Sequence, residues 1–158
     1  MATAEKFDAI ALLKADHRKV EDLFAKFEVA KGDGKKQALA EQICMELTVH
    51  AKIEEDVFYP ACEGKVEEDL LKEAYVEHDG AKKLIAEIQA SGPGDDYFDS
   101  KVHVLSEMIK HHVKEEEQAG GMFAEARQAK KMDLNSLGAA MAERKNALMA
   151  KTRATAPR

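Results

Sequence analysis

A histidine and a glutamate spaced four residues apart interrupt an apolar helical stripe twice in this chain. The first pair is His50-x-x-x-Glu54 and the second is His112-x-x-x-Glu116. Residues four apart share one helix face, about 6 Å apart along an axis that rises ~1.5 Å per residue. Around the first pair the same face carries core-type residues, namely Ile43, Leu47, Val57 and Ala61. A buried imidazole and a buried carboxylate need partners, because unpaired polar groups are costly to bury.

Apolar residues recur at intervals of three and four along most of the chain, which predicts amphipathic helices separated by glycine- and proline-containing turns. Three prolines and no tryptophan among 158 residues agree with an all-α chain. Pro60 is expected to kink or end its helix, and Gly120-Gly121 to break another. The expected helices cover about 5–31, 35–63, 66–90, 97–117 with a continuation to 131, and 133–151.

The chain also contains an internal repeat. A lone histidine on an apolar face precedes each motif: His17 precedes His50 by 33 residues, and His78 precedes His112 by 34. Two similar helical hairpins with short turns are typical of an antiparallel, up-down-up-down four-helix bundle. We therefore predict such a bundle over residues 1–131, an additional C-terminal helix packed on it at 132–151, and a disordered tail at 152–158.

The repeat should bring four imidazoles and two carboxylates to one level of the core. A single histidine on an apolar face is usually a hydrogen-bonded core residue, but six matched polar positions need something that satisfies all of them. Metal ions do so. The predicted ligands are His17, His50, Glu54, His78, His112 and Glu116. His103 and His111 are rotated away from this face and are excluded.

The ligand set narrows the choice of metal. A structural zinc site would be closed, tetrahedral and usually rich in cysteine, and magnesium or calcium would prefer oxygen ligands. Mixed nitrogen and oxygen ligation suits a dinuclear iron site, with manganese or other metals as substitutes. Two histidines per iron, bridging carboxylates from Glu54 and Glu116, and one oxo or hydroxo bridge give each ion about five ligands. Each ion then keeps an exchangeable position.

Charge and composition exclude several classes of partner. The net charge is −6 and the isoelectric point is about 5.6, which disfavours nucleic acid and anionic membranes. Cys44 and Cys62 lie on one predicted helix, about 27 Å apart, which is too far for a disulfide. Acidic residues stand near the N-terminus, where a signal peptide would be basic and apolar. We expect a cytoplasmic protein, monomeric or weakly dimeric, whose partners are small molecules.

The six residues resemble the pattern H…HxxxE…H…HxxxE of the hemerythrin-like HHE cation-binding domains, over about residues 8–125. The resemblance implies a non-haem di-iron centre that binds and reacts with O₂, peroxide or NO. One position departs from the pattern: oxygen-carrying members place a further histidine one turn before the third-helix ligand, where this chain has Ala74. The nearby Tyr75, Glu73 and Glu77 are less well in phase and are expected at the surface or beside the ligands.

Two classes of function fit these residues. One is an enzyme of oxidative or nitrosative stress that consumes peroxide or reduces NO, since two exchangeable positions permit two-electron chemistry. The other is a non-catalytic module that binds or senses O₂, NO or redox state, with iron storage or handling as a third reading. The lack of a carrier-type histidine at Ala74 favours peroxide consumption over reversible oxygen binding.

Overall fold

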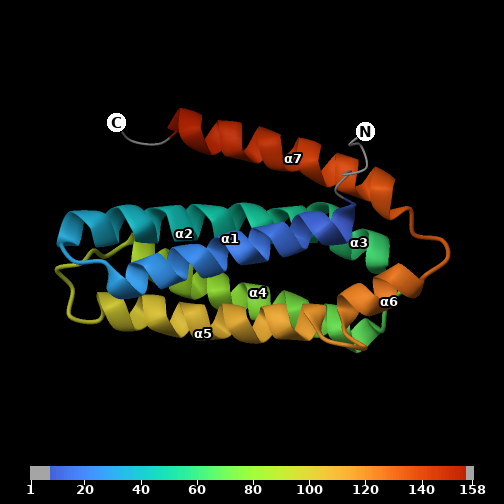
Figure 1. The fold of residues 1–158 in the computed structure, drawn as a ribbon, viewed down its shortest axis with the longest axis horizontal. Helices are drawn as coiled ribbons and strands as arrows, with labels where there is room; N and C mark the ends of the chain where they lie inside the picture. The colour runs from blue at the N-terminus through green and yellow to red at the C-terminus, as the bar shows by residue number, and fades with distance from the viewer. Residues whose placement is uncertain (1–7, 156–158) are drawn as a thin grey trace.

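The structure is a computed structural model that describes residues 8–155, with side chains to residue 152. Every regular element in this range is helical, which confirms the all-α class. In chain order the elements are α1 (Ala9–Val29), α2 (Asp33–Ile53), η2 (Glu54–Phe58), α3 (Tyr59–Cys62), α4 (Glu68–Gln89), α5 (Phe98–Glu117), α6 (Met122–Gln128) and α7 (Leu134–Thr155). The long helices α1, α2, α4 and α5 lie side by side, and α7 lies against α1 and α2 (Figure 1).

Local sequence accounts for several helix ends. Asp8 caps α1 by accepting the backbone N–H of Ala11 at 2.8 Å. Gly32 turns the chain between α1 and α2 with a φ of +95°, a conformation that favours glycine. Asp133 caps α7 as a side-chain acceptor for the Ser136 N–H at 3.0 Å.

The chain passes from α2 through η2 into α3 without leaving helical conformation, but η2 is a wide π turn. Pro60 supplies the physical reason. It has no N–H to donate to the Asp56 carbonyl, and its ring would clash with that carbonyl in an α-helix. The Tyr59 N–H instead bonds the Glu54 carbonyl five residues back. The expected kink at Pro60 is thus absorbed as one π turn placed beside Glu54.

The two consecutive glycines at 120 and 121 end α5, as expected. Gly120 has a φ of +77°. A Cβ on Gly121 would come within 2.5 Å of the Glu115 carbonyl oxygen, so the chain approaches itself too closely there for a side chain. After this turn α6 begins and places Phe123 in the core with 3% exposure.

Two apolar clusters lie on either side of a polar layer in the interior. One cluster lies toward the start of α1 and includes Ile10, Leu13, Ile53, Phe58 and Phe123. The other lies toward the end of α1 and includes Val20, Leu47, Ile85, Phe98 and Leu105. On α1 the predicted ligand His17 falls between the residues of the two clusters, so the polar layer has apolar side chains on both sides of it along that helix.

Helix α7 contributes few residues to the core. Met141 is fully buried, whereas most of its other side chains are partly or fully exposed. The helix continues past residue 151 to Thr155, and the expected disordered tail at 152–158 therefore overlaps it; residues 156–158 lie outside the described range. None of the described helices is long and apolar enough to cross a membrane. Cys44 and Cys62 are buried and unpaired, as expected.

Candidate metal centre

The structure brings all six predicted ligand side chains together from five elements. None of the six is more than 7% exposed. They form two overlapping groups in which the nitrogen and oxygen atoms lie within 4.8 Å of one another and which share Glu54. The first group is His17, His50, Glu54 and Glu116, and the second is Glu54, His78 and His112. The two excluded histidines lie outside both groups, with side chains 60% and 63% exposed.

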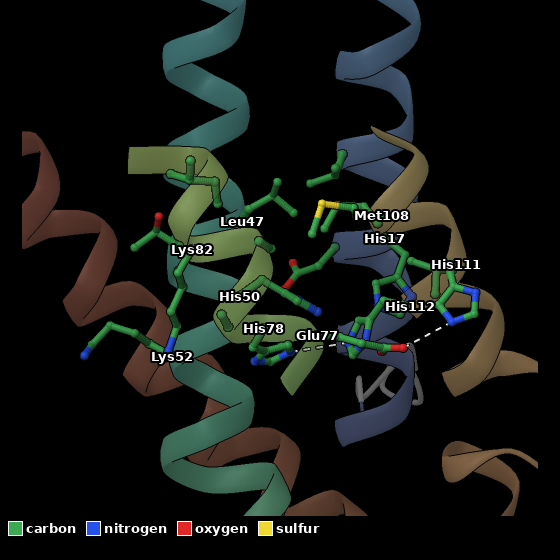
Figure 2. Close-up of a pocket in the computed structure, with 18 of the residues that line it drawn as sticks. His17, Leu47, His50, Lys52, Glu77, His78, Lys82, Met108, His111 and His112 are labelled. Carbon is green, nitrogen blue, oxygen red and sulfur yellow. Dashed lines mark hydrogen bonds and ion pairs between the residues drawn. The ribbon is translucent and has the colours of Figure 1, made fainter. Parts of the chain in front are cut away.

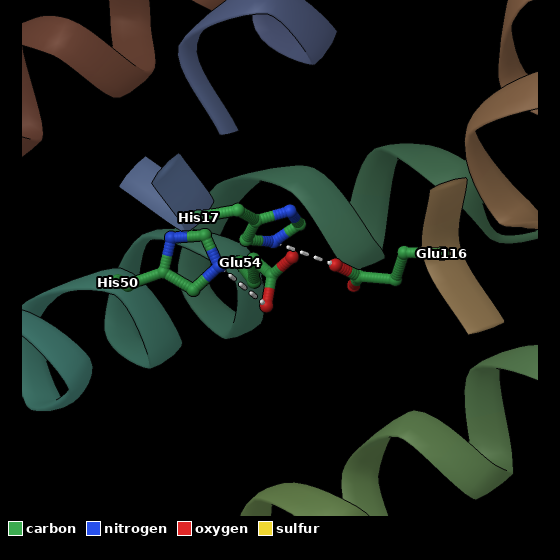
Figure 3. Close-up of side chains that lie close together, drawn as sticks. All are labelled: His17, His50, Glu54 and Glu116. Carbon is green, nitrogen blue, oxygen red and sulfur yellow. Dashed lines mark ion pairs between the residues drawn. The ribbon is translucent and has the colours of Figure 1, made fainter. Parts of the chain in front are cut away.

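The first group joins α1, α2, η2 and α5 (Figure 3). His17 directs its Nε2 at Glu116 Oε1, 3.2 Å away, and His50 directs its Nε2 at Glu54 Oε1, 3.4 Å away. The two imidazole rings lie with their centroids 5.0 Å apart. Two ring nitrogens and two carboxylates therefore converge on one point from different helices.

The second group joins η2, α4 and α5. Glu54 Oε1 lies 3.0 Å from His78 Nε2 and 3.8 Å from His112 Nε2. Glu116 extends its other oxygen, Oε2, to within 3.2 Å of His112 Nε2. Each carboxylate thus reaches histidines of both groups, which is the geometry that a bridging ligand requires.

Several inward-facing atoms of these groups have no hydrogen-bond partner among the described residues. They are His17 Nε2, His50 Nε2, Glu54 Oε2 and Glu116 Oε1. A buried polar atom without a partner costs a few kcal/mol, and four of them around one point call for a ligand that accepts electron pairs. A metal ion is such a ligand, and imidazole nitrogens with carboxylate oxygens are a donor set that transition metals bind. The residues present therefore fit a metal.

Each of the four histidines also bonds a carboxylate on its outer side through Nδ1. An ionised carboxylate only accepts, so Nδ1 carries the proton and Nε2 is left free to face the centre. The four pairs are His17 with Glu117 at 2.5 Å, His50 with Asp16 at 2.9 Å, His78 with Glu55 at 2.7 Å and His112 with Glu77 at 2.6 Å.

These outer carboxylates follow the internal repeat. Asp16 and Glu77 each precede a lone histidine and bond the motif histidine of the same repeat. Glu55 and Glu117 each follow a motif glutamate and bond the lone histidine of the other repeat. Sequence analysis did not assign these roles, although an acidic residue beside each ligand in both repeats was a visible signal.

A third layer of basic side chains surrounds the outer carboxylates. Arg18 contacts Glu117, Lys82 contacts Glu55, His111 contacts Glu77 and Lys145 contacts Asp16, at distances of 3.0, 2.7, 3.2 and 2.5 Å. Each outer carboxylate is held between a ligand histidine and one of these basic side chains. Hydrogen bonds to the ligand histidines therefore have fixed directions.

Protonation in the metal-free site follows from this crowding of carboxylates. Burial alone would lower the pKa of His50, but the nearby Glu54 and Asp16 raise it from 6.5 to about 10. Burial likewise opposes charge on Glu54, yet His50 and the other imidazoles hold the pKa of this carboxyl well below its usual value. The pKa of His112 is also raised, because Glu116 and Glu77 outweigh its burial. Metal-free protein consequently keeps protons where metal ions would bind.

Tyr59 is a side chain within the centre that sequence analysis did not identify. Its hydroxyl donates to Glu54 Oε1 at 3.0 Å and lies 2.6 Å from Glu116 Oε2, and it is 3.3 and 3.4 Å from the Nε2 atoms of His78 and His112. In an α-helix, residue i+5 lies about 140° around the axis from residue i. The wider π turn of η2 reduces that angle and carries Tyr59 onto the face of Glu54.

The tyrosine oxygen therefore lies among the ligands of the second group. Ala74, where a carrier-type histidine would stand, is buried in the same apolar cluster as Tyr59. Of the candidates near Ala74, Glu77 bonds His112 from outside and Tyr75 packs edge-on against the Tyr59 ring at 5.3 Å. Both accord with the expectation that they lie at the surface or beside the ligands. The only sequence signal for Tyr59 was its place next to Pro60.

A cavity of about 560 Å³ lies beside the histidines. His50, His78 and His112 lie on one side of it, with Leu47 and Met108 on the other (Figure 2). Its apolar wall also includes Val20, Ala81, Ile85 and Ile109. The Phe123 ring, which does not line the cavity, stacks on the His17 imidazole with the ring centroids 5.8 Å apart.

Comparisons with known proteins agree with this geometry. Residues 8–121 match the family described as Hemerythrin HHE cation binding domain. A protein from Nostoc sp. described as a DNA nickase is 33% identical over 116 residues, which cover 73% of this chain but 32% of that protein. The chain thus spans about a third of that relative.

A solved structure gives the same fold. The Hemerythrin HHE cation binding domain-containing protein from Mycobacterium kansasii has a TM-score of 0.79 and 24% identity, with 94% of this chain and 93% of that chain covered. The family match, covering most of the chain, agrees with a core of histidines and glutamates whose inward atoms lack partners. This chain belongs to the hemerythrin HHE cation-binding domain family.

Proposed function

We propose that this protein holds two iron ions, joined by an oxo or hydroxo group, and consumes peroxide at that centre. The observation that carries the proposal is the convergence of six buried donor residues, four of which have an inward atom without a hydrogen-bond partner among the described residues. His17 and His50 would hold one ion, and His78 and His112 the other. Glu54 and Glu116 would bridge, because each carboxylate reaches histidines of both groups.

Tyr59 would complete the second half of the centre. Its oxygen lies beside His78, His112 and both carboxylates, so it supplies a donor on the half that lacks a histidine at Ala74. Burial and the two carboxylates raise the pKa of its hydroxyl well above the usual value in metal-free protein. A bound cation reverses that preference and favours the phenolate.

When bound, a pair of irons would supply the two-electron redox chemistry that peroxide consumption needs. The overall reaction, two H₂O₂ giving O₂ and two H₂O, requires no external reductant. The chain itself contributes three things. The outer carboxylates fix the imidazoles, the Tyr59 oxygen supplies a donor beside His78 and His112, and the apolar cavity lets small molecules reach the histidines.

The proposal extends to organisation and partners. Helices α1, α2, α4 and α5 form an up-down-up-down antiparallel bundle within residues 1–131, on which 132–151 packs as an extra helix. Small molecules such as H₂O₂, O₂ or NO are the partners. DNA nicking, the activity for which the Nostoc relative is described, is not proposed here, because a net charge of −6 opposes binding to a polyanion.

Iron-loaded protein tests the proposal. We expect about two irons per chain and evolution of O₂ from H₂O₂ well above that of an equal concentration of free iron. Zinc-loaded protein is the control, since it fills the same donors without redox chemistry. A single metal per chain would refute the dinuclear centre. Two irons with O₂ evolution no faster than free iron would refute peroxide consumption and favour the binding or sensing alternative.

A further inference from the structure

The basic side chains around the outer carboxylates come from two parts of the chain. Arg18, Lys82 and His111 all lie within residues 8–121, the region that matches the family. Lys145 lies on α7, outside that region. One of the four outer carboxylates therefore receives its basic partner from a helix outside the region that matches the family.

The contact made by Lys145 is partly buried, because its partner Asp16 lies inside the protein. Its Nζ lies 2.5 Å from Asp16 Oδ1, and the other oxygen of Asp16 accepts the Nδ1–H of His50 at 2.9 Å. The Asp16 side chain is 6% exposed and the Lys145 side chain 26%. Removing one partner of a buried ion pair destabilises a protein more than removing one partner of a surface pair, because a buried charge is left without its counter-charge.

The two carboxylate oxygens of Asp16 bind different partners. Lys145 occupies one oxygen, which fixes the plane of the carboxylate and directs the second oxygen at His50. Nδ1 of His50 is thereby held, and its Nε2 is aimed at Glu54. Without the lysine, the carboxylate would be free to rotate and would attract the Nδ1 proton more strongly, which changes both the direction and the basicity of the ligand.

We propose that Lys145 is a positioning residue through which the C-terminal helix α7 sets the strength of the metal site formed by His17 and His50. The inference rests on the proposed metal centre and deepens it. It concerns one half of the centre, because the histidines of the other half bond Glu55 and Glu77, whose basic partners Lys82 and His111 lie on α4 and α5.

A matched pair of variants on α7 tests this role. Lys145→Met removes the charge and keeps most of the stem. Arg144→Met, on the same helix, removes an ion pair of 2.9 Å with Asp56, whose side chain is 40% exposed and contacts Arg144 instead of a ligand histidine. Both variants should weaken the packing of α7 on the bundle, but only Lys145→Met removes a contact to Asp16, the residue that bonds His50. Lys145→Arg should restore the wild-type behaviour because it keeps the charge.

The first measurement is cobalt binding by the full-length protein, in competition with a chromophoric chelator. Wild type should bind two ions, and Lys145→Met should bind one of them roughly 10–100-fold more weakly while the other is unchanged. Arg144→Met and Lys145→Arg should match wild type. Equal weakening in both methionine variants would show that α7 acts only through stability and would overturn the inference.

The second measurement needs no metal. The ¹⁵N chemical shifts of the His50 ring in metal-free protein should change in Lys145→Met, whereas those of His112 should not. Wild type that binds fewer than two cobalt ions would refute the proposed dinuclear centre on its own, whatever the variants do. Wild type that binds two, together with unchanged affinity and unchanged His50 shifts in Lys145→Met, would refute the role of Lys145 alone.

Discussion

Replacing Tyr59 with phenylalanine removes one oxygen atom from the middle of the centre and leaves the ring packing in place. That oxygen contacts Glu54 Oε1 at 3.0 Å and Glu116 Oε2 at 2.6 Å, and both carboxylates are buried. The pKa of each carboxyl is lowered, so both are ionised near neutral pH. The substitution therefore removes the single O–H donor that these two charged acceptors share, in a place that water does not refill easily.

The expected loss of stability follows from these contacts. A hydrogen bond to a charged group contributes about 1.5–3 kcal/mol, and a buried acceptor left alone costs more than an exposed one. Here each acceptor keeps a histidine neighbour, at 3.0 Å for Glu54 and 3.2 Å for Glu116. We therefore expect a net loss of about 2–3 kcal/mol in metal-free protein, which lowers Tm by roughly 5–10 °C for a chain of this size.

Thermal unfolding of metal-free Tyr59→Phe measures this directly, and Tyr75→Phe is the control. Tyr75 is 39% exposed and packs on the Tyr59 ring, so its substitution makes the same chemical change without touching the carboxylates. Ferric protein should in addition show a visible phenolate-to-iron band that Tyr59→Phe lacks. A Tm of Tyr59→Phe equal to that of Tyr75→Phe, with an unchanged ferric spectrum, would refute a role for the hydroxyl.

Three further predictions concern the centre. Glu54→Ala and Glu116→Ala should each lose both metal ions instead of only one, as measured by metal analysis, and should have a lower Tm than wild type under iron-loading conditions. His103→Ala is the control and should keep two irons. Retention of two irons by Glu54→Ala or Glu116→Ala would disprove the bridging role of that residue. Ala81→Phe fills the cavity beside the histidines and should slow peroxide consumption at unchanged iron content; an unchanged rate would mean that peroxide enters elsewhere. The folded-state pKa of His50 is raised from 6.5 to about 10, so its contribution to the stability of metal-free protein is complete below pH 6.5 and is lost as the pH rises towards 10. Metal affinity should increase over the same pH range, because the metal competes with the His50 proton. Stability measured by chemical denaturation and affinity measured by chelator competition should therefore change in opposite directions with pH.

Local spacing was enough to predict which side chains form the inner layer. The three- and four-residue spacing of apolar residues, the turn residues and the internal repeat placed His17, His50 and Glu54 on interior helix faces. The structure brings them together with the equivalent residues of the second repeat. This worked because a helix fixes the direction of each side chain relative to its neighbours three and four residues away. The break at Gly120-Gly121 was predictable for the same local reason.

The sequence by itself determined the helices, the six inward positions and the donor chemistry, since each depends on residues close together in the chain. Tertiary structure alone decided the rest. Which carboxylate bonds which histidine depends on how far helices slide along one another, and Asp16 meets Lys145 across 129 positions of sequence. Tyr59 enters the centre because the packed core accommodates the missing N–H of Pro60 as a π turn, a choice between kink and bulge that depends on the surrounding helices and not on the local sequence.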